Sequence, residues 1–148
     1  MFLFDFVAST PPAEPDTPIS GLWTFLPIGY LLTILVETPV LLVGLSSKVT
    51  LRQKILCGIW LSACTYPTVV LVMPMLFADW QRWQYLSVAE TFAPFAECLL
   101  FWLAFRGSEL LNKRDWVECF IAIVIANLAS FGIGEIFNYY GWFGLFSL

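Results

Sequence analysis

Four long runs of apolar residues alternate with short polar links along the chain. A helix needs about 20 mostly apolar residues to cross a bilayer, because its backbone groups must be paired internally there. The runs that meet this condition are residues 19–45, 55–77, 86–105 and 116–139. Because the links are short, each helix must lie antiparallel beside the one before it. The pattern therefore predicts an all-α transmembrane bundle of about four helices over residues 19–139.

Basic residues predict how this bundle is inserted, because Lys and Arg are retained preferentially on the cytoplasmic side. The second link contains Arg82, and the other basic residues lie in the first and third links: Lys48, Arg52, Lys54, Arg106, Lys113 and Arg114. Both termini are therefore predicted to lie outside the cytoplasm, in a membrane of the bacterial inner-membrane type.

The two ends of the chain are predicted to lie outside the bundle. Residues 1–18 contain four prolines and lack the basic start of a secretion signal, so they are interpreted as a retained, extended extracytoplasmic segment. Residues 140–148 form an aromatic interfacial tail. Aromatic residues of this tail and of the second link are predicted to contact the interface or a partner protein: Trp80, Trp83, Tyr85 and Trp142.

Composition narrows the function classes. Hydrophobic residues make up 59% of the 148 residues and charged residues 12%, whereas a soluble domain is about one quarter charged. The few basic residues are dispersed, which argues against nucleic acid as a partner. The chain contains no histidine, so imidazole ligation of a metal or haem is excluded. No cofactor or metal is predicted, although a bound lipid is compatible with this composition.

Four glutamates fall within the apolar runs: Glu37, Glu90, Glu97 and Glu135. Each costs about 2.5–3.5 kcal/mol at bilayer depth, so such residues usually face the protein interior. Glu37 and Glu97 are predicted to lie at similar depth, with at least one of them protonated because two close carboxylates cannot both stay ionised in low dielectric. Glu90 and Glu135 are predicted nearer the outer face, where their side chains can reach the surface.

Small and polar residues recur at helical spacing beside these glutamates, which places one polar face on every helix. The candidates for the bundle interior are Ser62, Thr65, Asn127 and Ser130. Residues of this kind most often serve helix packing and interhelical hydrogen bonds. For Glu37 and Glu97, a functional and a structural role are both open.

The order of features is similar in the two halves of the chain. Glu37 is followed by a basic link and the sequence ACTYP, and Glu97 by a basic link and ANLASFG. This order is compatible with two repeated helical hairpins related by a pseudo-two-fold axis along the membrane normal, and a chance similarity of two apolar sequences is the alternative. At these residues the chain resembles a family of small bacterial multi-pass membrane proteins that repeat a glutamate followed by an Asn/Thr/Ser-aromatic turn. The resemblance covers most of residues 30–138 and implies the four-helix fold, but no activity.

Two functions are open. Little of the chain lies outside the predicted helices, which favours an accessory or scaffolding subunit bound to other membrane subunits. The alternative is a small proton- or cation-translocating protein that uses its intramembrane glutamates. Four helices leave little room for a pore, so conduction would require a homo-oligomer. The sequence has none of the common nucleophile, zinc or phosphate-binding motifs, and no enzymatic activity is predicted.

Overall fold

The computed structural model describes residues 19–140, and residues 1–18 and 141–148 lie outside the described part. Every regular element of the described part is helical. The elements are α2 (Ile19–Gly44), α3 (Leu51–Pro67), the π-helical turn η1 (Thr68–Val72), α4 (Met73–Leu76), α5 (Arg82–Phe105) and α6 (Lys113–Tyr139). Four stretches are long and apolar enough to cross a membrane: Leu26–Gly44, Leu51–Leu76, Trp83–Phe105 and Lys113–Phe137. The predicted all-α fold with four candidate spans is confirmed.

Three helices, α3, α5 and α6, begin about one turn earlier than the apolar pattern indicated, because polar residues cap them. At the start of α3, the Thr50 hydroxyl accepts a hydrogen bond from the Gln53 amide, and the Gln53 side chain accepts one from the Thr50 amide. At the start of α5, the Gln84 side chain accepts a hydrogen bond from the Gln81 amide. At the start of α6, the Asn112 side chain accepts hydrogen bonds from the amides of Arg114 and Asp115. Such caps satisfy backbone donors that have no partner within the helix.

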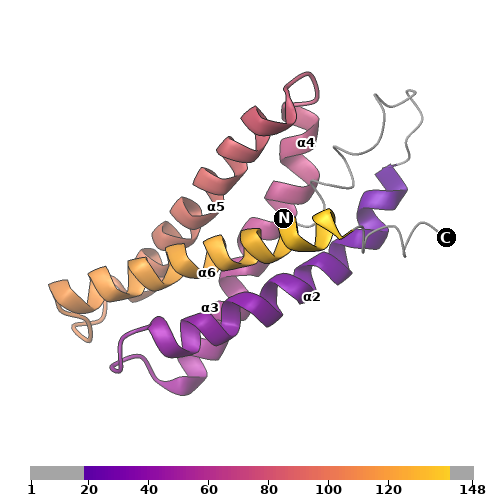
Figure 1. The fold of residues 1–148 in the computed structure, drawn as a ribbon. Helices are drawn as coiled ribbons and strands as arrows, with labels where there is room; N and C mark the ends of the chain where they lie inside the picture. The colour runs from indigo at the N-terminus through magenta and orange to yellow at the C-terminus, as the bar shows by residue number, and fades with distance from the viewer. Residues whose placement is uncertain (1–18, 141–148) are drawn as a thin grey trace.

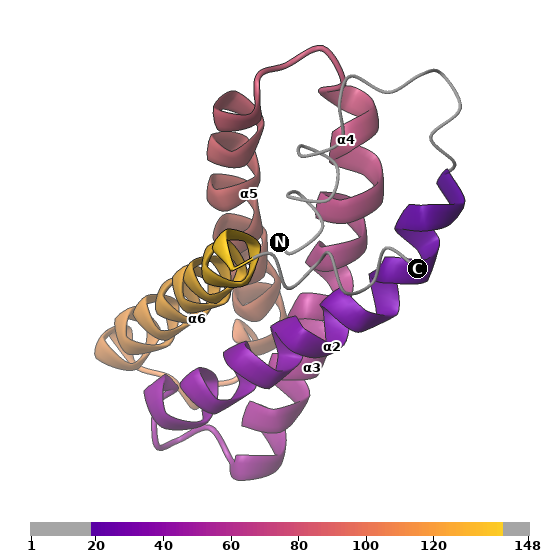
Figure 2. The same ribbon diagram turned by 45° about the vertical axis from the view of Figure 1, so that its right-hand side comes forward.

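The helices meet at the end of the molecule that carries residues 46–50 and 106–112, here called the basic end (Figure 1). Toward the other end, which carries residues 77–81 and is called the aromatic end, α4 and α5 turn away from α2 and α6 (Figure 2). The Lys54 ammonium group donates hydrogen bonds to the carbonyl oxygens of Leu42 and Leu45. This lysine therefore closes the last turn of α2, where a cation also suits the helix dipole.

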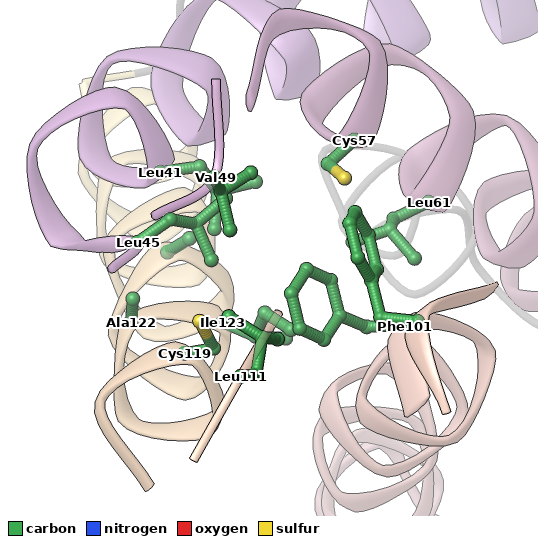
Figure 3. Close-up of a cluster of buried hydrophobic side chains, with 12 residues drawn as sticks. Leu41, Leu45, Val49, Cys57, Leu61, Phe101, Leu111, Cys119, Ala122 and Ile123 are labelled. Atoms are coloured by element: carbon green, nitrogen blue, oxygen red, sulfur yellow. The ribbon is translucent and has the colours of Figure 1, made fainter. Parts of the chain in front are cut away.

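An apolar core fills the basic end (Figure 3). Each long helix contributes a side chain that is at most 1% exposed: Leu41, Leu61, Phe101 and Ile123. The Phe101 ring stacks on Phe105 at a centroid distance of 4.6 Å and meets the edge of Trp116 at 5.8 Å. The four long helices therefore pack directly against one another, through these side chains, in the half of the bundle nearer the basic end.

Close approach of the backbones supports this packing. A Cβ atom on Gly58 would lie 3.1 Å from Cα of Thr38, and one on Gly44 would lie 2.7 Å from Cβ of Ala122. Neither position has room for a larger side chain without a shift of its neighbour. Small residues therefore bring α3 and α6 against α2, as is common in membrane bundles.

The aromatic end contains two separate apolar clusters in place of one core. The first joins α2, α3 and α6 around Tyr66 and Val70. The second joins η1, α4 and α5 around Val69, Met73, Tyr85 and Ala89. Pro74 explains part of the second cluster, because a π-helical turn would pair the Val69 carbonyl with the amide that Pro74 lacks. The Tyr85 hydroxyl donates to that carbonyl at 3.2 Å, and so ties α5 to η1.

Candidate functional site

The Glu37 carboxyl group lies inside the bundle, one turn of α2 from Leu41. The side chain is 3% exposed, and Oε2 lies 2.6 Å from the hydroxyl of Ser62 on α3. The same hydroxyl lies 2.9 Å from the Gly58 carbonyl oxygen, one turn back along α3. Ser130 of α6 also contacts the Glu37 carboxyl group. Three helices therefore meet at this carboxyl group.

Glu97 of α5 has an equivalent environment and is 2% exposed. Its Oε1 lies 2.9 Å from the Thr65 hydroxyl, which is also 3.1 Å from the Leu61 carbonyl oxygen. Asn127 Nδ2 donates to Oε2 of Glu97 at 2.7 Å and to the Ile123 carbonyl oxygen at 3.0 Å. The Glu97 carboxyl group is therefore bound from α3 and from α6.

The contacts of the two glutamates follow the proposed repeat. Glu37 pairs with Ser62 and Glu97 with Asn127, in each case a buried polar residue on the second helix of its own hairpin. The polar residue three positions later, Thr65 or Ser130, contacts the glutamate of the other hairpin. The exchange is reciprocal, as two hairpins related by a pseudo-two-fold axis would give. The sequence predicted that these polar residues converge, and their exchange between hairpins became visible only in the structure.

A cavity of about 30 Å³ adjoins the two carboxyl groups. The described residues that line it come from all four long helices and η1: Thr33, Glu37, Thr65, Tyr66, Val69, Glu90, Ala93, Glu97, Asn127 and Ser130. A water molecule needs about 10–15 Å³ of such space, so about two or three waters fit. The cavity lies on the aromatic-end side of the apolar core.

Three buried polar atoms in this lining have no hydrogen-bond partner: Thr33 Oγ1, Tyr66 OH and Glu90 Oε1. Thr33 is 5% and Tyr66 4% exposed, so neither side chain can be satisfied by bulk solvent. Leaving such an atom unpaired costs about 1–3 kcal/mol. Of the four such atoms among the described residues, all but Thr38 Oγ1 thus border a space large enough for water.

Three candidate residues are placed differently from the prediction or lie beyond it. Glu90 was predicted to extend toward the surface, but its Oε1 is buried against the cavity because residue 90 shares the inner face of α5 with Glu97. Tyr85 was predicted at the interface, but it is 8% exposed, because its hydroxyl donates a hydrogen bond to the Val69 carbonyl oxygen. Trp80 and Trp83 are 48% and 63% exposed, which leaves them free for the predicted interfacial or partner contacts. Trp142 lies outside the described residues. Glu135 does not line the cavity, although it interacts electrostatically with Glu90.

Sequence reasoning did not single out Tyr66 as a site residue, although its position four residues after Ser62 placed it on the same helical face.

Asp115 was assigned to the third link by the apolar pattern. In the structure Asp115 accepts hydrogen bonds from the Lys48 ammonium group at 2.7 Å and from the Ser46 hydroxyl at 2.9 Å. Asp115 thereby joins the first link to the start of α6. Its position three residues after the Asn112 cap, the spacing of a capping box, was the available signal.

Comparisons with protein families, with curated proteins and with solved structures found no match to this chain. Its class therefore rests on the structure and the composition. The four apolar helices are compatible with a multi-pass membrane protein. Within that class, the features that distinguish this chain are the carboxyl pair and the adjoining cavity.

Proposed function

We propose that this multi-pass membrane protein binds and releases protons inside the bilayer, with the Glu37 and Glu97 carboxyl groups as the binding pair. One observation carries the proposal: each of two hydroxyl groups lies within hydrogen-bond distance of both a glutamate oxygen and a backbone carbonyl oxygen. These hydroxyls belong to Ser62 and Thr65. A hydroxyl has one proton to donate and can also accept.

The two hydroxyl groups therefore suit both charge states of the carboxyl groups. When Glu37 is ionised, Ser62 donates its proton to the carboxylate. When Glu37 is protonated, it donates to Ser62, which turns its own proton to the Gly58 carbonyl oxygen. Thr65 can alternate in the same way between Glu97 and Leu61. Proton uptake and release then require only rotation of a hydroxyl hydrogen, and no buried polar group loses its partner.

The charges around the pair favour a proton over a metal ion. Among the described residues that line the cavity are three carboxyl groups and no Lys or Arg. Buried carboxylates without a positive partner are unfavourable, and taking up a proton relieves this cost. The three carboxyl groups are not close enough together to coordinate one metal ion, and no other trio of acidic or thiol side chains among the described residues is.

Infrared spectroscopy of the protein in liposomes tests the proposal. We expect a band from protonated carboxyl groups that weakens in Glu37→Gln and in Glu97→Gln and is reduced further in the double variant. Glu118→Gln is the matched control, because Glu118 is partly exposed and pairs with Arg114 at 3.0 Å. A double variant that retains the whole band over the accessible pH range would refute the proposal.

A second candidate function is that of an accessory or scaffolding subunit of a larger membrane complex. Two observations favour it. The links of the described part are short, and the large side chains of Trp80 and Trp83 are exposed together at the aromatic end. Aromatic anchors of this kind are enriched where membrane proteins meet partners or headgroups.

Co-purification in mild detergent tests this second candidate. If the aromatic end holds a partner subunit, Trp80→Ala with Trp83→Ala should release it, whereas Trp60→Ala should not. Trp60 is a suitable control because it is similarly exposed, at 43%, but lies within the third turn of α3. Recovery of the native protein without any other subunit would contradict the accessory role.

The proposed location is the cytoplasmic membrane of a bacterial-type cell, with the basic end inside. Its support is the distribution of Lys and Arg, which leaves only Arg82 near the aromatic end. A reporter domain that is active only outside the cytoplasm should therefore be active when it is fused to the C-terminus, and a reporter that is active only in the cytoplasm should not. Activity of a cytoplasmic reporter at that position would reverse the orientation.

A further inference from the structure

The proposed proton-binding pair does not account for the whole cavity, because unpaired polar atoms in the cavity lining extend from the pair toward the aromatic end. Thr33 lies one turn of α2 beyond Glu37, and Tyr66 lies one turn of α3 beyond Ser62. Glu90 lies two turns of α5 beyond Glu97. The partnerless atoms of these residues all border the cavity.

On the basic-end side of the Glu37–Glu97 pair, packed apolar side chains block any path for water to the carboxyl groups. Leu41 and Phe101 follow the two glutamates by one turn toward the basic end, and Leu61 precedes Ser62 directly. All three side chains are at most 1% exposed and belong to the apolar core (Figure 3). A tightly packed apolar layer of this kind holds no water to transfer a proton.

We propose that water in this cavity, held by Tyr66 and Thr33, connects Glu90 to the Glu37–Glu97 pair and carries protons to it from the aromatic end only. This inference rests on the proposed proton-binding function, and it assigns Glu90 as the group through which protons enter. A water with two to four polar partners is well held. The cavity supplies that number from the three unpaired atoms and the carboxyl pair.

The transfer is balanced as follows. The O–H bond of the Glu90 carboxyl group breaks as its proton passes to the cavity water, and the same water gives another proton to the ionised carboxyl group of the pair. An O–H bond forms there, and the negative charge moves from the pair to Glu90. Glu90 then regains a proton from the aromatic end.

The titratable and polar side chains around this route determine the electrostatic environment of a proton that moves along it. The titratable and polar residues around it on the described helices are Thr33 and Glu37 of α2, Ser62, Thr65 and Tyr66 of α3, Glu90, Glu97 and Cys98 of α5, and Asn127, Ser130 and Glu135 of α6. The lining carries no positively charged side chain among the described residues. An arriving proton therefore meets carboxyl and hydroxyl oxygens and no fixed positive charge in the described lining.

The experiment is a pH jump on one side of oriented proteoliposomes, followed by the infrared band of the carboxyl pair. In the native protein, a jump on the aromatic-end side should change the band quickly, and a jump on the basic-end side slowly. Glu90→Gln should slow the response by about 100-fold, the low end of what a positioned proton donor contributes. It should leave the equilibrium contribution of Glu37 and Glu97 to the band in place.

A second variant tests the cavity without removing any polar group. Ala93 lines the cavity, so Ala93→Val should fill part of it and slow the response. Ala104→Val, at an exposed position of the same helix, is the control and should respond as the native protein does. Both variants retain every carboxyl and hydroxyl group.

The outcomes separate this inference from the proposed function. If the native protein has no band that depends on Glu37 and Glu97, the proton-binding function fails. If the band is present but equally fast from both sides, or unchanged in rate by Glu90→Gln and Ala93→Val, the route is wrong. A loss of the pair's own band in Glu90→Gln would also overturn the route, because Glu90 would then belong to the binding pair.

Discussion

The helices pack differently at the two ends of the bundle. At the basic end, four helices share one apolar core that contains Leu41, Leu61 and Phe101. At the aromatic end, two smaller clusters leave a polar cavity between the helices, bordered by Thr33, Tyr66 and Glu90. The difference shows that the bundle is held together mainly at the basic end. The aromatic end can therefore retain buried polar atoms that lack protein partners.

The largest expected effect comes from removing a side chain of the packed end. Phe101→Ala should lower the free energy of unfolding by about 2–3 kcal/mol, below the cost in soluble cores because Phe also partitions well into lipid when unfolded. Phe95→Ala on the same helix, where Phe95 is 70% exposed, should cost much less. Unfolding in mixed micelles, followed by circular dichroism, measures both. Equal losses would contradict a core confined to the basic end.

A smaller effect is expected where backbones approach closely. Gly58→Ala should destabilise the protein by about 1–2 kcal/mol, because the added methyl group meets the backbone of Thr38. Gly132→Ala should be neutral or slightly stabilising, because a Cβ there meets nothing within 4 Å and Ala is the better helix former. The same unfolding assay compares the two. A stable Gly58→Ala variant would mean that α2 and α3 are not in close contact.

The smallest effect compares two buried tyrosines. Tyr85→Phe removes a hydrogen bond to the Val69 carbonyl oxygen and should cost about 1 kcal/mol. Tyr66→Phe removes a hydroxyl group that has no protein partner, so its cost should be smaller by most of that amount. Thermal unfolding in detergent resolves this difference. The proposed cavity water can keep its other partners when the Tyr66 hydroxyl is removed, so a Tyr66→Phe variant as costly as Tyr85→Phe would mean that this hydroxyl has a protein partner instead.

Much of the carboxyl site could be predicted from spacing along the helices. Residues three or four positions apart share a helical face, so Ser62, Thr65, Asn127 and Ser130 were expected to face the interior with the glutamates. The depth of each helix in an antiparallel hairpin follows from its length and the short links. That is why Glu37 and Glu97 were predicted at similar depth, and the structure places both carboxyl groups within hydrogen-bond distance of these interior polar residues.

Helical spacing puts Glu90 on the same face of α5 as Glu97, but the burial of its carboxyl group and the orientation of Tyr85 could not be predicted in the same way. Both lie on α5 near the aromatic end, where an apolar pattern allows a polar tip to turn outward or inward. The outcome depended on a neighbouring helix: Pro74 leaves the Val69 carbonyl without its amide partner and draws the Tyr85 hydroxyl inward. For Glu90, the space between the two apolar clusters of the aromatic end made the inward position available.

The sequence by itself determined that the chain forms four apolar helices with one polar face each, because hydropathy and helical periodicity are local properties of consecutive residues. Only the tertiary structure decided which polar group meets which. The exchange of Thr65 and Ser130 between hairpins and the grouping of Thr33, Tyr66 and Glu90 around one cavity depend on how helices far apart in the sequence rotate and approach. Those rotations are set by side-chain packing across the whole bundle, which no single segment contains.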